Sequence, residues 1–172
     1  MYVTSGPRYV KQRDKFSCGP VAIMNVLKWS GMEFSHEYLR DWAGGLCECG
    51  PPDGTAHKKF EKGLRQASKA YGRPFTVRKV MHPTLAQIDE HLREGGAIVL
   101  NYYWRREDEG TSNRHFMLVA GISDSGKSYL TVNDHREGPA ARWDTRTLFK
   151  KSNLRFQKTD SSFKGWFISL KE

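Results

Sequence analysis

The sequence contains no apolar run long enough to cross a membrane, which takes about 20 consecutive residues. Its start, MYVTSGPRYVKQRDK, also lacks the apolar segment that a signal peptide needs. Cysteine is scarce, and an odd count of three does not fit the disulfide framework of a secreted protein. We therefore expect a soluble, cytoplasmic protein with free thiols and no membrane partner.

The composition allows one hydrophobic core. With 172 residues, 38% of them hydrophobic, the chain fits a single domain spanning 1–172. Lys and Arg outnumber Asp and Glu by 28 to 19, and the net charge of +9 would attract nucleic acid or acidic partners. The positive residues are scattered rather than clustered, so we rank nucleic acid well below a protein or peptide as the partner.

Residues 17–30 give the clearest helix signal. Ser17 suits the N-cap, Pro20 suits the first turn, and Gly31 suits the end of the helix. Apolar residues occupy most of its circumference, which is typical of a buried helix. Cys18 is therefore expected at the start of a central, buried helix.

The remaining pattern predicts further helices followed by strands. Thr84 and Gln87 form a capping box at the start of one helix, and the turn SDSGKS (123–128) joins two strands. We predict helices near 35–43, 55–71, 84–94 and 145–151, and strands at 75–80, 97–104, 115–122, 129–134 and 165–170. This order indicates an α+β fold with an antiparallel sheet.

Cys18 is a candidate nucleophile. The thiolate is the reactive form, and a helix N-terminus or a nearby imidazole favours it. The alternative is a buried structural cysteine, which is the commoner role of a single thiol.

Of the six histidines, one occupies the position expected of a catalytic base. His115 begins an apolar strand directly after a polar loop, which places it at the rim of the sheet. The others are expected to be solvated or to lie at a strand end, and they are His36, His57, His82, His91 and His135.

The hairpin after His115 supplies a partner for its ring. If the turn centres on 124–126, His115 faces Asp134 or a residue next to it, with Cβ atoms roughly 5 Å apart. A carboxylate there would fix the tautomer and stabilise the imidazolium. A register one residue off would offer the amide of Asn133 instead.

Gln12 is a candidate for stabilising negative charge. Its uncharged amide N–H₂, six residues before Cys18, could donate to an oxyanion together with the backbone N–H of Cys18.

Together these residues resemble the papain-like cysteine peptidases, and most closely the bacteriocin-processing, or double-glycine-leader, peptidase family and its free-standing relatives. The shared features run from about residue 10 to 135: Gln12 followed by CGP (18–20), Gly54-Thr55 before a helix, the unit LAQIDEHLREGGAIVL, RHFMLVAGI and LTVND. Two features depart from the family: His135 stands where its members usually have proline after the Asp, and no membrane transporter segment is present.

The resemblance implies a papain-like fold and a catalytic set of Cys18, His115, Asp134 and Gln12. Cys18 would attack a carbonyl, His115 would act as base and then acid, Asp134 would orient the ring, and Gln12 would line the oxyanion hole. The reaction would be cleavage of a peptide or isopeptide bond in a protein or peptide substrate, without a cofactor. Deamidation, deconjugation and acyl transfer share the thioester intermediate and remain open.

Two other interpretations are weaker. Cys47 and Cys49 form C-x-C near His57, but zinc sites favour a wider spacing and a fourth ligand, so no metal is expected. A basic binding protein on the same scaffold is the second alternative, although a pure binder has no need of four specific side chains.

Overall fold

The computed structural model describes residues 7–14, 16–32, 42–49, 55–70, 72, 75–103, 114–153 and 163–171. The predicted start of the second helix at 35–41, Gly54 and the loop 105–113 lie outside these residues.

The described residues form one six-stranded antiparallel sheet. In spatial order the strands are β1 (Phe75–Met81), β6 (Lys164–Leu170), β2 (Ala97–Tyr103), β3 (Arg114–Ile122), β4 (Ser128–Val132) and β5 (Ala141–Thr145). The helices are α1 (Cys18–Trp29), α3 (His57–Ala70), α4 (Leu85–Arg93) and α5 (Arg146–Asn153), and residues 42–46 form a further helical turn. The predicted α+β class is confirmed.

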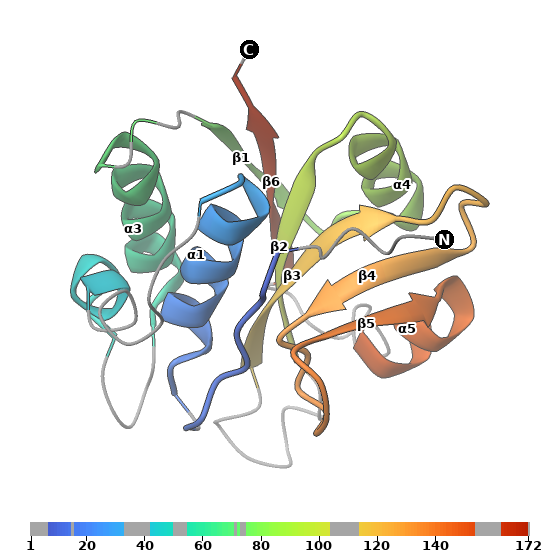
Figure 1. Cartoon of the computed structure of the whole chain (residues 1–172), viewed down its shortest axis with the longest axis horizontal. Coiled ribbons are helices and arrows are strands. Elements are labelled where there is room, and N and C mark those ends of the chain that lie inside the picture. The colour runs from blue at the N-terminus through green and yellow to red at the C-terminus, as the bar shows by residue number, and fades with distance from the viewer. Residues whose placement is uncertain are drawn as a thin grey trace.

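Helices cover both faces of the sheet (Figure 1). The α1 and α3 helices pack on one face, and α4 and α5 pack on the other. Each face has its own core because successive residues of a strand point to opposite sides. On β3, Phe116 and Leu118 join the α1 side, whereas Met117 and Val119 join the α4 side.

The α1 helix is buried almost completely, as its apolar circumference predicts. Gly31, with a φ of 92°, ends it as expected. The predicted cap differs in detail, because the Ser17 side chain makes no cap hydrogen bond. Instead the Asp14 carboxylate accepts hydrogen bonds from the backbone N–H groups of Phe16 and Ser17, at 3.0 and 2.7 Å.

Other local signals behave as predicted. The Thr84–Gln87 capping box is present at the start of α4. The hairpin of β3 and β4 pairs Leu118 with Val132, as a turn near 124–126 requires. The ladder ends at Val132, so it does not extend to His115 itself.

Two histidines expected to be solvated are not. His91 is buried on α4 and its Nε2 lies 3.0 Å from the Ile168 carbonyl oxygen. His57 is half-buried, and its Nε2 lies 2.5 Å from Asn101 Oδ1. His82 is exposed as predicted, and His36 lies outside the described residues.

Within the described part of the chain, no helix combines the length and the apolar character needed to span a bilayer.

Candidate active site

Cys18 is the first residue of α1, at the end where backbone N–H groups have no intrahelical partner. The residue is 8% exposed. A Cβ added at Gly19 would lie 2.6 Å from Thr55 Oγ1, so this position has room only for glycine. Thr55, just before α3, therefore packs directly against the backbone of the first turn of α1. This packing explains why the Cys-Gly-Pro motif has glycine at its second position.

The Cys18 sulfur is a protonated thiol in the resting protein. Burial raises the pKa of Cys18 to about 11, the opposite of the lowering that a helix N-terminus alone would give. Hydrogen bonds from the backbone of Phe116, Gly19 and Cys18 itself favour the thiolate but do not outweigh burial. The thiol therefore needs a base before it can act as a nucleophile at neutral pH.

His115 is buried near the start of β3, and its ring nitrogens are distinguishable by their contacts. Its Nε2 is hydrogen-bonded to the main-chain carbonyl oxygen of Asn133. Because a carbonyl oxygen only accepts, Nε2 carries the hydrogen and Nδ1 keeps its lone pair. The ring is thus held in the tautomer in which Nδ1 can take a proton.

The environment of His115 keeps it neutral. Burial lowers the pKa of His115 to about 4, while the Asn133 carbonyl and the charge of Asp134 act in the opposite direction. Tyr102, its cross-strand neighbour on β2, packs edge-on against the ring with centroids 5.9 Å apart. A neutral imidazole is the form that a general base requires.

Asp134 lies directly after Asn133, and its carboxylate is bound by other residues. Arg136 donates to both oxygens, from Nε at 2.9 Å and from Nη2 at 2.8 Å. The His135 Nδ1 lies 3.2 Å from Oδ1. Burial acts to raise the pKa of Asp134, but the hydrogen bonds of Arg136 and the charge of His135 lower it overall. The carboxylate is therefore ionised.

Gln12 belongs to a strap, residues 10–12, that joins α1 to the end of β4. Asn25 of α1 exchanges two hydrogen bonds with the backbone of Val10. The Asn133 side chain accepts from the Gln12 backbone N–H and donates to Gln12 Oε1, both at 3.0 Å. Gln12 Nε2 donates one hydrogen to the Asp14 carbonyl oxygen at 2.9 Å. The strap thus fixes both the backbone and the amide of Gln12.

The four predicted residues lie near the start of β3 and the end of β4, with different degrees of contact. Cys18 and His115 approach through Phe116, which follows His115 and hydrogen-bonds the sulfur through its backbone. Among the described residues, no hydrogen bond joins the Cys18 sulfur to the His115 ring, or the ring to the Asp134 carboxylate. Asp134 acts on His115 through its charge.

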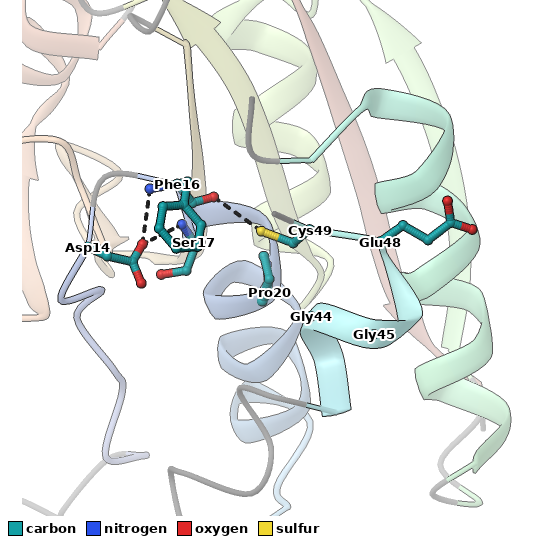
Figure 2. Close-up of a pocket in the computed structure, with 8 residues that line it drawn as sticks. All are labelled: Asp14, Phe16, Ser17, Pro20, Gly44, Gly45, Glu48 and Cys49. Atoms are coloured by element: carbon teal, nitrogen blue, oxygen red, sulfur yellow. Dashed lines mark hydrogen bonds between the residues drawn. The ribbon is translucent and has the colours of Figure 1, made fainter. Parts of the chain in front are cut away.

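A pocket of about 450 Å³ lies beside the first turn of α1 (Figure 2). Phe16, Ser17 and Pro20 line it from the start of α1, and Gly44 and Gly45 line it from the neighbouring helical turn. Asp14, Glu48 and Cys49 complete the described lining, and Cys18 itself is not among these residues.

Sequence reasoning missed three residues that organise this site. Asn133 was considered only as an alternative partner through its amide, whereas its main-chain carbonyl contacts the ring. Its φ of 54° lies in the left-handed region, which asparagine tolerates better than most residues. Lys11 donates to the main-chain carbonyl oxygens of Asp134 and Arg136. The roles of Lys11 and Arg136 depend on tertiary contacts, which leave no local signal in the sequence.

The other two cysteines lie near the same helix. Cys47 is fully buried, and its Sγ lies 3.5 Å from Thr55 Oγ1. The half-buried Cys49 Sγ lies 3.4 Å from the Phe16 carbonyl oxygen, a contact drawn as a dashed line in Figure 2. In the ranges that the structure covers, no cluster of three or more His, Cys, Asp or Glu residues could hold a metal ion.

Solved structures of other proteins share this fold. The peptidase domain of Streptococcus ComA, a bifunctional ABC transporter involved in a quorum sensing pathway, is 15% identical, with a TM-score of 0.57 over 92% of this chain and 95% of that chain. A protein from Bacillus anthracis described as a C39-like peptidase is 12% identical, with a TM-score of 0.61 over 99% of this chain and 98% of that chain. Both likenesses concern the fold. No curated protein matches the chain significantly.

The sequence itself matches a family profile, that of the Peptidase_C39 like family, over residues 6–162. The match spans most of the chain, including the start of α1, β3 and the end of β4. Family and fold together support a cysteine-peptidase-like function. The chain belongs to the Peptidase_C39 like family.

Proposed function

We propose that this protein is a thiol peptidase that hydrolyses a peptide or isopeptide bond in a protein or peptide substrate. Cys18 is the nucleophile, His115 is the base and then the acid, and Gln12 donates to the oxyanion. Asp134 stabilises the imidazolium by its charge.

The observation that carries the proposal is the hydrogen bond between His115 Nε2 and the Asn133 carbonyl oxygen. It commits the only ring hydrogen to an acceptor and leaves Nδ1 as the site for the proton of the thiol. The burial of both groups supports a neutral thiol and a neutral imidazole at rest, since the pKa of Cys18 is raised and the pKa of His115 is lowered. Proton transfer therefore accompanies attack on the substrate.

The reaction follows in two stages. The sulfur bonds to the carbonyl carbon while its proton passes to His115 Nδ1, and the carbonyl oxygen becomes negative. The C–N bond then breaks, and His115 gives the proton to the leaving amine. Water attacks the thioester with His115 as base, the C–S bond breaks, and the thiol regains its proton.

Two donors are suited to the oxyanion. The backbone N–H of Cys18 belongs to the first turn of α1, where no intrahelical acceptor is available. An amide nitrogen carries two hydrogens, and one of those on Gln12 Nε2 is used by Asp14, so the second is the proposed donor. The hydrogen bond from the Asn133 side chain to Gln12 Oε1 supports the oxyanion role of Gln12, since pre-organised donors stabilise developing charge most effectively.

A peptide substrate is supported by the fold shared with the peptidase domain of Streptococcus ComA. The test is to incubate the purified chain with a peptide library derived from a bacterial proteome and to identify new termini by mass spectrometry. Hydrolysis yields two fragments whose masses sum to that of the substrate plus one water, whereas deamidation leaves the peptide chain uncut.

Cys18→Ala should abolish cleavage, and His115→Ala should reduce it by at least about a hundredfold, the usual contribution of a general base. The matched control is Cys49→Ala, which removes a neighbouring thiol that the proposal does not use. Cleavage that survives Cys18→Ala, or that is lost in Cys49→Ala, would show that another group performs the reaction.

A further inference from the structure

Tyr102 of β2 contacts the proposed base but takes no part in the proposed reaction steps. It is the cross-strand neighbour of His115 on β3, and the two side chains lie on the same face of the sheet. Tyr102 is 1% exposed and packs edge-on against the His115 ring, with centroids 5.9 Å apart and planes at 77°. In a close-packed interior such a contact restricts the orientations open to the imidazole.

The hydroxyl group of Tyr102 is bound by His135. Its oxygen lies 2.9 Å from His135 Nδ1, and the backbone N–H of His135 also donates to it. Met117 Sδ, a weak acceptor, is farther away at 3.9 Å. A hydroxyl both donates and accepts, so it can bond Nδ1 whether or not that nitrogen carries a hydrogen. The link between Tyr102 and His135 therefore does not depend on the protonation state of His135.

His135 extends this link to Asp134. The same Nδ1 lies 3.2 Å from Asp134 Oδ1, and the charge of Asp134 acts on His115. The rings of Tyr102 and His135 are also in edge-on contact, with centroids 5.7 Å apart. Tyr102 thus contacts the imidazole of His115 through its ring and, through its hydroxyl, the residue beside the Asp134 carboxylate.

The link depends on the residue by which this chain departs from its family. Members usually have proline after the Asp, where this chain has His135. A proline has neither a ring nitrogen that bonds a hydroxyl nor a backbone N–H, so it would remove both of these contacts of Tyr102. The His135 side chain is only 13% exposed, so solvation does not account for a histidine at this position.

We propose that Tyr102 is a positioning residue of the peptidase site, which holds the His115 ring for proton transfer and is itself fixed by His135. This inference rests on the proposed function, because it concerns the efficiency of the same reaction. In this role the hydroxyl touches neither the substrate nor the reacting atoms. It restricts the Tyr102 ring, and through that ring the position of His115 Nδ1 relative to the thiol proton.

The first test compares two tyrosine variants in peptide cleavage. Tyr102→Phe keeps the ring and removes the hydroxyl, so kcat should fall about tenfold while KM changes by less than about twofold. The matched control is Tyr129→Phe. Tyr129 is fully buried in the same core, opposite Ile122 at the far end of β3, and its hydroxyl donates to Asp89.

The control variant should lose stability but keep the wild-type kcat, because its hydroxyl has no link to His115. An equal fall of kcat in Tyr102→Phe and Tyr129→Phe would show that loss of any buried hydroxyl slows the reaction, and it would overturn the proposal. A wild-type kcat in Tyr102→Phe would overturn it as well.

A second comparison tests the link to His135. His135→Phe removes the ring nitrogen, and it should lower kcat too. Because both substitutions break one link, the double variant should be no slower than the slower of the two single variants. If the two reductions multiplied, the residues would act independently, and the role of His135 would be overturned.

A spectroscopic readout separates this proposal from the peptidase reaction. The Nε2–H of His115 is buried and bonded to the Asn133 carbonyl oxygen, so its proton signal should be visible in the NMR spectrum of the resting protein. The signal should broaden through faster exchange with water in Tyr102→Phe and stay sharp in Tyr129→Phe, with circular dichroism establishing that both variants are folded. A wild type that cleaved no peptide would refute the peptidase function, whereas an unchanged His115 signal in Tyr102→Phe would overturn the positioning role by itself.

Discussion

The buried imidazole of His115 makes the stability of the protein depend on pH in a calculable way. Burial lowers the pKa of His115 from 6.5 to about 4. Between these values the unfolded chain binds a proton that the folded chain does not, so the free energy of unfolding falls as the pH falls. One pKa unit corresponds to about 1.4 kcal/mol, so lowering the pH from about 7 to about 5 should cost about 2 kcal/mol through this group.

The assay is urea unfolding of the wild type and of His115→Gln at both pH values. Glutamine does not titrate, so the wild type should lose about 2 kcal/mol more than the variant on acidification. Contributions from all other groups are common to both proteins and cancel in the comparison. An equal loss in wild type and His115→Gln would refute the buried, neutral imidazole.

Three further predictions concern the residues around this ring. The kcat/KM for peptide cleavage should fall as the pH drops through about 4, where the proposed base His115 gains its proton. A fall centred near pH 6.5 would instead place the His115 ring in a solvated environment. Arg136→Ala leaves the buried carboxylates of Asp134 and Asp144 without their shared guanidinium, so the free energy of unfolding should fall by about 3 kcal/mol at neutral pH. Urea unfolding measures this loss, and Arg136→Lys should recover part of it. An unchanged urea midpoint would contradict the ion-pair network. Asn133→Gly keeps the left-handed backbone but removes both side-chain hydrogen bonds to Gln12, so kcat should fall about tenfold and the free energy of unfolding by about 2 kcal/mol. Asn133→Ala should lose about 1 kcal/mol more through backbone strain, and a wild-type kcat in the glycine variant would remove the role of Gln12.

Elements with strong local signals could be predicted from the sequence. The apolar circumference of α1 and the capping box of α4 depend on residues close together in the chain, and both are present. The register of β3 and β4 follows from a short turn whose ends are adjacent. Each of these features is decided by interactions within a few residues.

Long-range pairing could not be predicted in the same way. The GWFISL segment predicts a closing strand, but the place of β6 between β1 and β2 depends on pairs of residues 63 to 95 positions apart in the chain. The β5 strand was not predicted at all, because ARWDT lies at the sheet edge and only Asp144 of it is buried. An edge strand of this kind has no apolar alternation to reveal it.

The sequence around His91 does carry a signal for burial, contrary to the expectation of a solvated side chain. Ile88, His91 and Leu92 follow one another at the spacing of a single helix face, and all three are buried. A Cβ at Gly96 would lie 2.3 Å from His91 Nε2, so the glycine makes room for the ring. A histidine on the apolar face of a helix, followed by a glycine pair, is better interpreted as a satisfied core residue.

The candidate site depends on one residue more than on any of the four that the sequence singled out. The left-handed backbone of Asn133 ends the ladder of β4 and aims its carbonyl oxygen at His115. The same residue uses its side chain to hold Gln12, 121 positions earlier in the chain. The proposed base and the proposed oxyanion donor are therefore positioned by a single asparagine. A shift of Asn133 would displace the His115 ring and the Gln12 amide together. Proton transfer by His115 and stabilisation of the oxyanion by Gln12 should therefore be lost together.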